Sequence, residues 1–268
     1  MSHTNSYIIA GGAEGKERLN VLARILEEST KKLIQSHGNL KGKSFLDVGC
    51  GGGHVALMTA ALVGKQGRVT AIDFDETIIG LARADAAQSG VKHVTFHSMS
   101  AYDLEQKHQY DIAYSRFLLS HLTQPEIVLH AMAAAVKPGG AVIIEDIDFS
   151  GHYCYPQRRS FSAYVNLFTK AANNNGHNAN IGLSLYKMMK DVGLNKVTFN
   201  VIQPAFLSGE GKWMAFYTLD KIRRTVVAQK IATEAEVNEL LEDLQRFTED
   251  KDSIISMPRI FQVVGYRE

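Results

Sequence analysis

The sequence has little cysteine, little net charge and no long hydrophobic run, and each shortage excludes a class of protein. Its 268 residues include two cysteines, Cys50 and Cys154, which cannot build a disulfide framework and lack the spacing of a zinc site. The formal net charge of +1 leaves no electrostatic footprint for nucleic acid. No apolar run approaches the ~20 residues of a membrane span, and residues 1–15 lack a secretory pattern. We therefore expect a cytoplasmic protein with free thiols that binds neither nucleic acid nor membrane.

The sequence also lacks the usual signs of division into several domains. Hydrophobic residues make up 45% of the chain, which is ordinary for a globular protein with a sizeable core. No internal repeat, low-complexity stretch or linker interrupts it. We therefore predict a single domain over residues 1–268. The sequence contains no signal for an oligomeric state.

Short apolar runs alternate with helical patterns through the first 150 residues. Helices are predicted to begin near Arg18, His54, Asp75 and Thr123, the last of them behind a capping box with Glu126. The runs predicted as strands are 43–48, 68–73, 93–98, 110–115 and 141–146. Strands that alternate with helices at this spacing form right-handed βαβ units. The sequence therefore predicts an α/β fold with a parallel sheet.

The pattern is looser on either side of this region. Residues 1–17 are polar and glycine-containing and are predicted to form a flexible arm or a lid. Beyond residue 150, apolar spacing predicts helices over 181–191 and 211–230, a strand over 196–203 and a last strand over 260–266. A second capping box, Thr233 with Glu236, starts one more helix. The chain thus has a helical insertion before its final strand.

The stretch Asp47-Val48-Gly49-Cys50-Gly51-Gly52-Gly53 joins the first predicted strand to the next helix. Glycines in this position permit a positive φ and close approach of a ligand, which is typical of a nucleotide-binding turn. The glycine spacing alone leaves a dinucleotide open, because Gly51 to Ala56 fits the alanine form of that pattern. Asp47, however, would repel a pyrophosphate and suits a ligand with a cationic amino group. Asp73, which ends the second strand, is placed to accept hydrogen bonds from a ribose.

This stretch matches the D-x-G-x-G-x-G signature of class I S-adenosylmethionine-dependent methyltransferases, and residues 40–150 resemble that family in three further blocks. The blocks are Ala71–Phe74, Tyr110–Leu122 and Lys137–Gly140. The resemblance, which extends to a group of small-molecule methyltransferases, implies a Rossmann-like, seven-stranded, mostly parallel sheet with helices on both faces. It divides the chain into an N-terminal arm and helix (1–37), a cofactor-binding core (40–150), acceptor-pocket helices with a sixth strand (151–256) and a final strand (257–268).

The resemblance also implies which residues bind the cofactor, S-adenosylmethionine, and its product S-adenosylhomocysteine. The methionine part would be held by the side chain or backbone of Asp47, Gly49, Cys50, Gly51 and Gly53. Asp73 would bind the ribose, Phe74 would pack on the adenine, and Ser115 would lie beside the carboxypropyl chain. Ser100 and Ala101 stand where the family often has an acid followed by alanine, so the adenine amino group loses its carboxylate partner. Cys50 is predicted to be a small residue that fits the turn.

In-line methyl transfer from a sulfonium needs little acid-base help, since the leaving group is already good. A base is needed only for a hydroxyl or a protonated amine, and His121, after the fourth strand, is the candidate. The alternative is that His121 lies on a helix face and its ring is hydrogen-bonded to a neighbouring residue, without a catalytic role. Glu145, Asp146 and Asp148 end the fifth strand and could orient a cationic acceptor, but no histidine stands at ligand spacing, so no metal site is expected.

We therefore expect a methyltransferase that moves a methyl group to an O, N or C nucleophile of a small molecule. Residues 1–17 and 150–256 would form the lid and the acceptor pocket, lined by Tyr153, Tyr155 and Trp213. Two alternatives remain open. One is an NAD(P)-dependent oxidoreductase on a dinucleotide fold, and the other is a protein that binds S-adenosylmethionine without catalysis.

Overall fold

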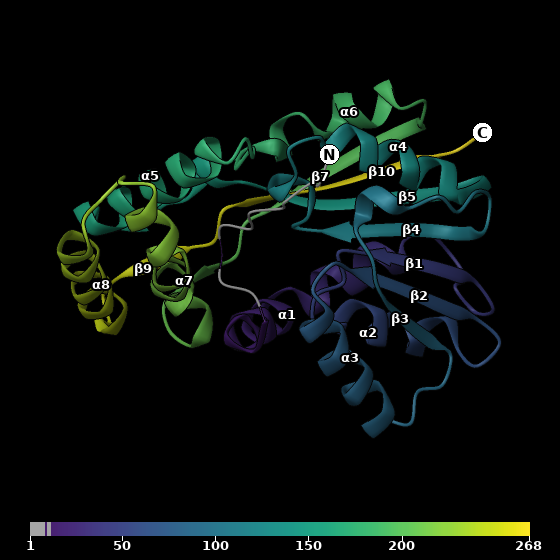
Figure 1. The fold of residues 1–268 in the computed structure, drawn as a ribbon, viewed down its shortest axis with the longest axis horizontal. Coiled ribbons are helices and arrows are strands. Elements are labelled where there is room, and N and C mark those ends of the chain that lie inside the picture. Colours follow the sequence, from purple (N-terminus) through teal and green to yellow (C-terminus); the bar gives the residue numbers. More distant parts are fainter. Residues whose placement is uncertain (1–8, 10–11) are drawn as a thin grey trace.

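The computed structural model describes Ile9 and residues 12–268 (Figure 1). The helices are α1 Gly12–Gln35, α2 His54–Val63, α3 Glu76–Gln88, α4 Pro125–Ala135, α5 Arg159–Asn174, α6 Leu185–Asp191, α7 Met214–Ala228 and α8 Glu234–Glu249. The strands are β1 Ser44–Val48, β2 Arg68–Asp73, β3 Val94–Ser98, β4 Tyr110–Arg116, β5 Val136–Asp148, β6 Cys154–Tyr155, β7 Asn195–Ile202, β8 Ala205–Phe206, β9 Ile254–Ser256 and β10 Arg259–Tyr266. None of the described helices is long and apolar enough to cross a bilayer.

The main sheet has seven strands in the order β3-β2-β1-β4-β5-β10-β7. The strands β1 to β5 pair in parallel, whereas β10 runs antiparallel between β5 and β7. The predicted Rossmann-like, mostly parallel, seven-stranded sheet is therefore confirmed. The chain order reverses between β1 and β4. In such sheets a crevice for ligands opens outside the carboxyl ends of the strands at that reversal.

Both faces of the main sheet are covered, because apolar side chains along its strands alternate between two cores. In β1, Phe45 packs into the core built with α2 and α3, whereas Leu46 and Val48 pack into the core built with α4 and α6. All five residues of β1 are buried, as expected for a central parallel strand. The sheet is thus a rigid platform whose carboxyl edge carries the glycine turn.

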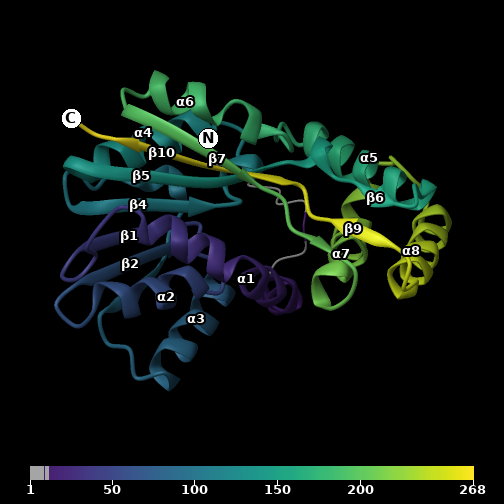
Figure 2. The same ribbon diagram turned by 180° about the vertical axis from the view of Figure 1, so that it is seen from behind.

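A third core lies beyond the carboxyl edge, and helices α5, α7 and α8 form it with the small sheet β6-β9-β8. We call these elements the cap. Figures 1 and 2 show the cap at one end of the molecule, with α1 between it and the main sheet. Leu22 and Leu26 of α1 pack into the cap core, and Ile34 packs into the core of the sheet. Helix α1 therefore joins the two parts.

The structure corrects two predictions about helix starts. Helix α1 begins at Gly12, so only the first part of the predicted arm, residues 1–8 and 10–11, lies outside the described residues. A helical Gly15 costs about 0.5–1 kcal/mol relative to alanine, but the packing of α1 against both cores outweighs this. The capping box at Thr123 does not form, because Pro125 is the first helical residue and makes Gln124 the N-cap. The box at Thr233 and Glu236 forms as predicted.

Candidate functional site

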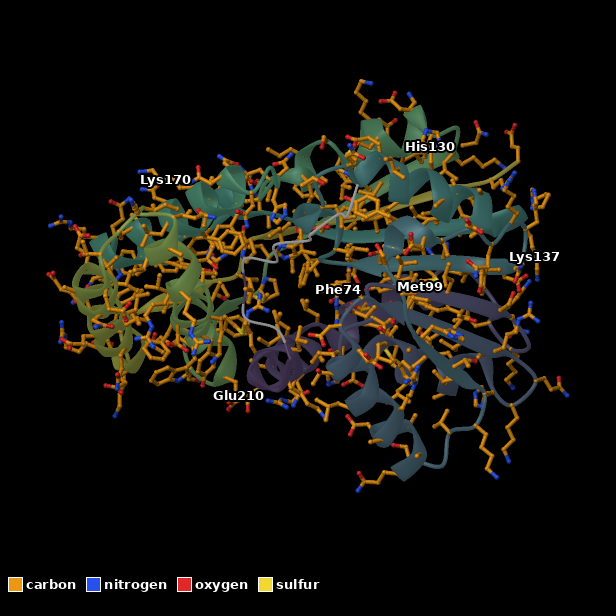
Figure 3. All side chains as sticks on the ribbon, in the orientation of Figure 1. Phe74, Met99, His130, Lys137, Lys170 and Glu210 are labelled. Atoms are coloured by element: carbon orange, nitrogen blue, oxygen red, sulfur yellow. The ribbon has the colours of Figure 1, made fainter. Side chains whose placement is uncertain are left out.

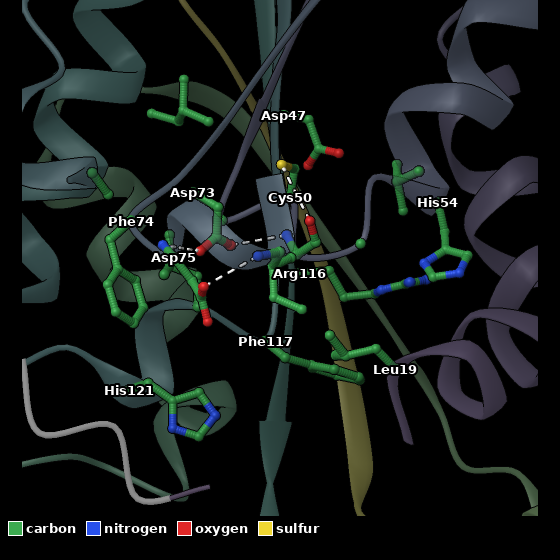
Figure 4. A pocket seen from close by; sticks show the side chains of 18 of the residues that line it. Leu19, Asp47, Cys50, His54, Asp73, Phe74, Asp75, Arg116, Phe117 and His121 are labelled. Atoms are coloured by element: carbon green, nitrogen blue, oxygen red, sulfur yellow. Dashed lines mark hydrogen bonds between the residues drawn. The ribbon is translucent and has the colours of Figure 1, made fainter. Parts of the chain in front are cut away.

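The glycine loop between β1 and α2 turns sharply and is tied to the end of β2. Gly49, Gly51 and Gly53 have φ values of 72°, 50° and 77°, a region that favours glycine. The N–H groups of Gly49 and Cys50 both donate to the Ile72 carbonyl, over 2.8 and 3.0 Å. A hollow lies against this loop, at the carboxyl ends of β1, β2 and β4 and beside α1 (Figure 4). We call it the loop pocket.

Asp73 fixes the loop and also faces the loop pocket. Its Oδ2 accepts a hydrogen bond from the Gly51 N–H over 2.9 Å, and its Oδ1 accepts one from the Asp75 N–H over 3.1 Å, as Figure 4 shows. Burial raises the pKa of Asp73, and the two N–H donors oppose that rise. Each carboxylate oxygen has a further lone pair. Asp73 can therefore accept hydrogen bonds from a ligand without releasing the loop.

Asp47, at the end of β1, is a buried acid whose Oδ2 has no hydrogen-bond partner among the described residues. Burial raises the pKa of Asp47 to about 7, and the nearby Arg116 guanidinium limits this rise while Asp73 adds to it. A buried acid with a spare oxygen is unfavourable by itself. Asp47 and Arg116 both line the loop pocket, so a carboxylate and a guanidinium face one ligand space.

The other residues predicted to bind the cofactor divide into two groups. Cys50, Phe74 and Ala101 line the loop pocket, and Phe74 is 48% exposed. Burial raises the pKa of the Cys50 thiol well above its usual range, so it is a neutral packing group and not a thiolate. Figure 3 shows Phe74 and Met99, another lining residue, at the end of the sheet that faces the cap, with Lys137 at the opposite end.

Three predicted residues support the scaffold instead and are absent from the pocket lining that the structure describes. Gly53 caps α2, and a Cβ there would lie 2.7 Å from the Phe96 ring. The Ser100 hydroxyl accepts a hydrogen bond from the Tyr102 N–H, and the Ser115 hydroxyl donates to the Val48 carbonyl over 2.8 Å. Turn geometry thus accounts for Gly53 and Ser100, and the contact between β4 and β1 accounts for Ser115.

A second hollow, which we call the cap pocket, continues from the loop pocket toward α5 and α7. Ile9, Arg18, Leu22, Phe117 and His121 line both hollows. Residues of the cap and of the β5 end complete its wall, among them Phe149, His152, Tyr164, Phe168, Met214 and Thr218. A ligand in the cap pocket would therefore meet a ligand in the loop pocket at His121 and Arg18.

His121 lies at this junction, in the short turn that follows β4, and only 8% of it is exposed. Its ring is 6.2 Å from that of His177 in an edge-on arrangement. Burial lowers the pKa of His121 to about 3, and His177 and Arg18 contribute to this. A general base works best when its pKa is near the working pH. His121 is therefore neutral at pH 7, yet holds a proton too weakly to be an effective base.

Three aromatic residues predicted to line the acceptor pocket are absent from the lining of the cap pocket that the structure describes. Tyr153 and Tyr155 are 47% and 65% exposed, and Trp213 packs against Phe216 and Tyr217. The acids at the end of β5 are also engaged within the protein. Glu145 accepts hydrogen bonds from Thr30, Tyr114 and Gln262, Asp146 accepts one from the Ser120 N–H, and Asp148 pairs with Arg259.

Sequence reasoning missed the contribution of α1 to both pockets. Gly15, Arg18, Leu19 and Leu22 all line the loop pocket. Their spacing of three, four and seven residues places them on one helical face. The sequence signal that could have indicated this contribution is an arginine on a helical face that is otherwise small and apolar. Three consecutive residues at the end of β4, Arg116, Phe117 and Leu118, also line the loop pocket. They lie in a motif that the sequence analysis recognised without assigning them roles.

Comparison with known proteins gives one family match and several relatives. The methyltransferase domain family matches residues 39–196, more than half of the chain. The ubiquinone biosynthesis O-methyltransferase of Hydrogenovibrio crunogenus is 36% identical over 119 residues, which are 44% of this chain and 48% of that protein. The chain spans about half the length of the curated relatives it matches.

Two solved structures share the fold over most of the chain. A protein of Bacillus halodurans C-125 assigned to the methyltransferases has a TM-score of 0.61 and 22% identity, over 89% of this chain and 98% of that one. Phosphoethanolamine N-methyltransferase 2 of Haemonchus contortus, solved with phosphomonomethylethanolamine and S-adenosylhomocysteine, has a TM-score of 0.57 and 17% identity, over 90% of this chain and 53% of that one. At these identities the likeness concerns the fold alone.

Proposed function

The chain belongs to the methyltransferase domain family, and from that premise we propose that it binds S-adenosylmethionine in the loop pocket and transfers the methyl group to a small molecule in the cap pocket. The observation that carries the proposal is that Asp47 and Arg116 both line the loop pocket beside the glycine loop. The amino-acid end of this cofactor has an ammonium and a carboxylate side by side. A buried acid with an unpartnered oxygen suits the ammonium, and a guanidinium suits the carboxylate.

The chain's own residues have three tasks in this reaction. Asp47 and Arg116 hold the amino-acid end, the loop backbone approaches it where Gly49 and Gly51 have no Cβ, and Asp73 accepts hydrogen bonds from the ribose. The bound cofactor supplies an activated methyl group on a sulfonium. Leu19, Phe117 and Leu118 keep water from the pocket, which favours direct transfer to the acceptor. The names of the curated relatives favour an oxygen atom as acceptor.

Replacing Asp73 with alanine is expected to weaken the binding of S-adenosylhomocysteine by about 1–3 kcal/mol, because charge-assisted hydrogen bonds to the ribose are lost. The same change removes the acceptor for the Gly51 and Asp75 N–H groups. Isothermal calorimetry measures the affinity. Asp191→Ala is the matched control, since among the described residues that exposed acid of α6 pairs with Lys187 alone. An unchanged affinity in Asp73→Ala would show that the ribose lies elsewhere.

Calorimetric titration with S-adenosylmethionine, S-adenosylhomocysteine and NAD tests the proposed cofactor. We expect binding of both sulfur compounds and none of NAD, because Asp47 would repel a pyrophosphate. The antiparallel β10 also stands in place of the second mononucleotide half of a dinucleotide fold. Absence of binding by both sulfur compounds would contradict the proposal.

Distinguishing an enzyme from a protein that only binds the cofactor requires methyl transfer itself. The protein is incubated with S-adenosylmethionine carrying a labelled methyl group and with a panel of phenols, carboxylates and amines. We expect label in an oxygen acceptor. Cofactor binding without label in any acceptor would favour the non-catalytic alternative.

A further inference from the structure

The cap pocket has one cation at its entrance and no carboxylate in the lining that the structure describes. That cation is Arg18, which lines both pockets and therefore lies where the acceptor would meet the methyl group. The guanidinium Nε donates to the Thr218 hydroxyl at 3.5 Å. Among the described residues, Arg18 forms no ion pair.

A half-buried guanidinium with no acidic partner in the part of the chain that the structure describes leaves most of its five donors for a ligand. The other arginines near it are engaged in different ways. Arg24, less than two turns along α1, pairs with Glu210 at 2.7 Å, and Arg116 donates to Thr30. The charge of Arg18 acts on groups inside the cap pocket, since it contributes to the pKa of His121 and of Tyr164. An opposite charge in the ligand would complete the site.

Aromatic rings form part of the wall of the cap pocket, beside aliphatic side chains such as those of Ile147 and Met214. The Phe149 ring stacks on the Phe168 ring, with 3.9 Å between the ring centres, and also on the His152 ring, with 4.5 Å between the centres. Both ring nitrogens of His152 are shielded from solvent and have no hydrogen-bond partner among the described residues. Buried polar atoms without partners are rare in native proteins. The His152 nitrogens therefore leave hydrogen bonds for a ligand to supply in the cap pocket, whose volume is about 40 Å³.

We propose that the cap pocket binds a planar, ring-bearing acceptor as an oxyanion, a carboxylate or a phenolate, whose charged oxygen pairs with Arg18 at the junction with the loop pocket. This inference rests on the proposed methyl transfer and specifies its acceptor. Aromatic walls select the ring, and the guanidinium selects the charge. Cationic amines are disfavoured because they would meet both Arg18 and the sulfonium.

The reaction then needs no proton acceptor. A lone pair of the oxyanion forms the new C–O bond as the C–S bond breaks, and the electrons of the C–S bond stay on sulfur. The products are a methyl ester or a methyl ether and a neutral thioether, and no proton moves. This agrees with His121, whose low pKa makes it a poor base. Methylation also removes the negative charge that Arg18 held, which weakens product binding.

Calorimetry on the full chain saturated with S-adenosylhomocysteine tests the proposal with ring compounds of matched size. The probes are benzoate and 4-nitrophenolate as the two oxyanions, benzamide as the neutral compound and benzylamine as the cation. We expect at least one oxyanion to bind about tenfold or more tightly than benzamide, and benzylamine to bind least. Whichever of benzoate and 4-nitrophenolate binds more tightly shows whether the site prefers a carboxylate or a phenolate.

Arg18→Gln should abolish the preference for the oxyanion, while Arg24→Gln on the same helix should preserve it. Arg18→Lys keeps the charge but not the planar fork, so it should bind the oxyanion more weakly and still prefer it over benzylamine. If Arg18→Gln does not fold, the oxyanion affinity of Arg18→Lys tests the proposal instead. Each variant is first titrated with S-adenosylhomocysteine, and failure of the wild type at that step overturns the proposed function.

If S-adenosylhomocysteine binds, the remaining outcomes concern the acceptor alone. Equal binding of benzoate, 4-nitrophenolate and benzamide would overturn the oxyanion proposal. The same holds for a preference that survives in Arg18→Gln, and for the absence of binding by every ring compound at millimolar concentration.

Discussion

Replacing Asp47 with asparagine is expected to stabilise the ligand-free protein and, in the same variant, to weaken cofactor binding by about 30-fold or more. The two effects have one cause. The Asp47 carboxyl is buried, and one of its oxygens has no partner among the described residues. Its charge is therefore unfavourable in the empty pocket and favourable beside the cofactor ammonium. Asparagine removes the charge in both states.

The pH dependence gives the sign of the stability effect. Burial raises the pKa of Asp47 from 3.8 to about 7. Between these values the folded state holds a proton that the unfolded state has lost, so the free energy of unfolding falls as the pH rises. The full cost, on the order of 2–4 kcal/mol, is reached above pH 7. Urea unfolding should show Asp47→Asn more stable than the wild type at pH 8 and nearly equal at pH 4.

Asp111 provides the matched control for this prediction, because the shift of its pKa has the opposite sign. Burial raises the pKa of Asp111, but hydrogen bonds from Ser44 and Lys137 outweigh burial and lower it below the usual range. Its charge is stabilising, and Asp111→Asn should destabilise the protein at pH 8. It lies at the amino end of the sheet, so affinity for S-adenosylhomocysteine should not change. A destabilised Asp47→Asn with unchanged affinity would contradict our assignment.

Replacing Glu145 with alanine is expected to lower the free energy of unfolding by about 3–5 kcal/mol. Glu145 is fully buried, and three elements donate hydrogen bonds to it: Thr30 of α1 at 2.7 Å, Tyr114 of β4, and Gln262 of β10 at 2.7 Å. Alanine leaves all three donors without their acceptor inside the protein. Urea unfolding with a probe for two-state behaviour measures the loss.

Glu145→Gln tests whether the hydrogen bonds of Glu145 or its negative charge stabilise the fold. Glutamine keeps one oxygen acceptor and nearly the same volume, and the hydroxyls of Thr30 and Tyr114 can turn to a new partner. We therefore expect this variant to lose clearly less stability than Glu145→Ala. Equal losses in the two variants would show that the negative charge, and not the set of hydrogen bonds, holds α1 against the sheet.

Much of the sheet could be predicted because its signals are local. Strands β1, β4 and β5 contain largely buried apolar runs, and the loop has a positive φ at Gly49, Gly51 and Gly53, which favours glycine. The start of α1 could not be predicted. Residues 12–17 carry no apolar periodicity, and their helix depends on packing against the cap and the sheet. The capping box predicted at Thr123 fails for a local reason, since Pro125 fixes the first helical residue.

Much of the lining of the loop pocket could be predicted from the sequence, whereas the lining of the cap pocket could not. Asp47 and Asp73 each stand in a short continuous motif, so their roles were proposed from those motifs. Arg18 and Tyr164 are separated by 146 positions in the sequence, and only the docking of α1 against the cap brings them to one pocket. Tyr153 and Trp213 were chosen as aromatic residues in the right region, but the burial of a single side chain depends on tertiary packing.

The position of β10 has a consequence for the order in which the protein folds. This strand lies between β5 and β7, although it follows both in the chain by more than 50 residues. During synthesis the edge of β5 stays open until residues 259–266 have left the ribosome. Closing such a long loop is slow, and an open edge is prone to pair with other chains. Completion of the sheet is therefore a late step in folding, and chaperone demand should be highest just before it.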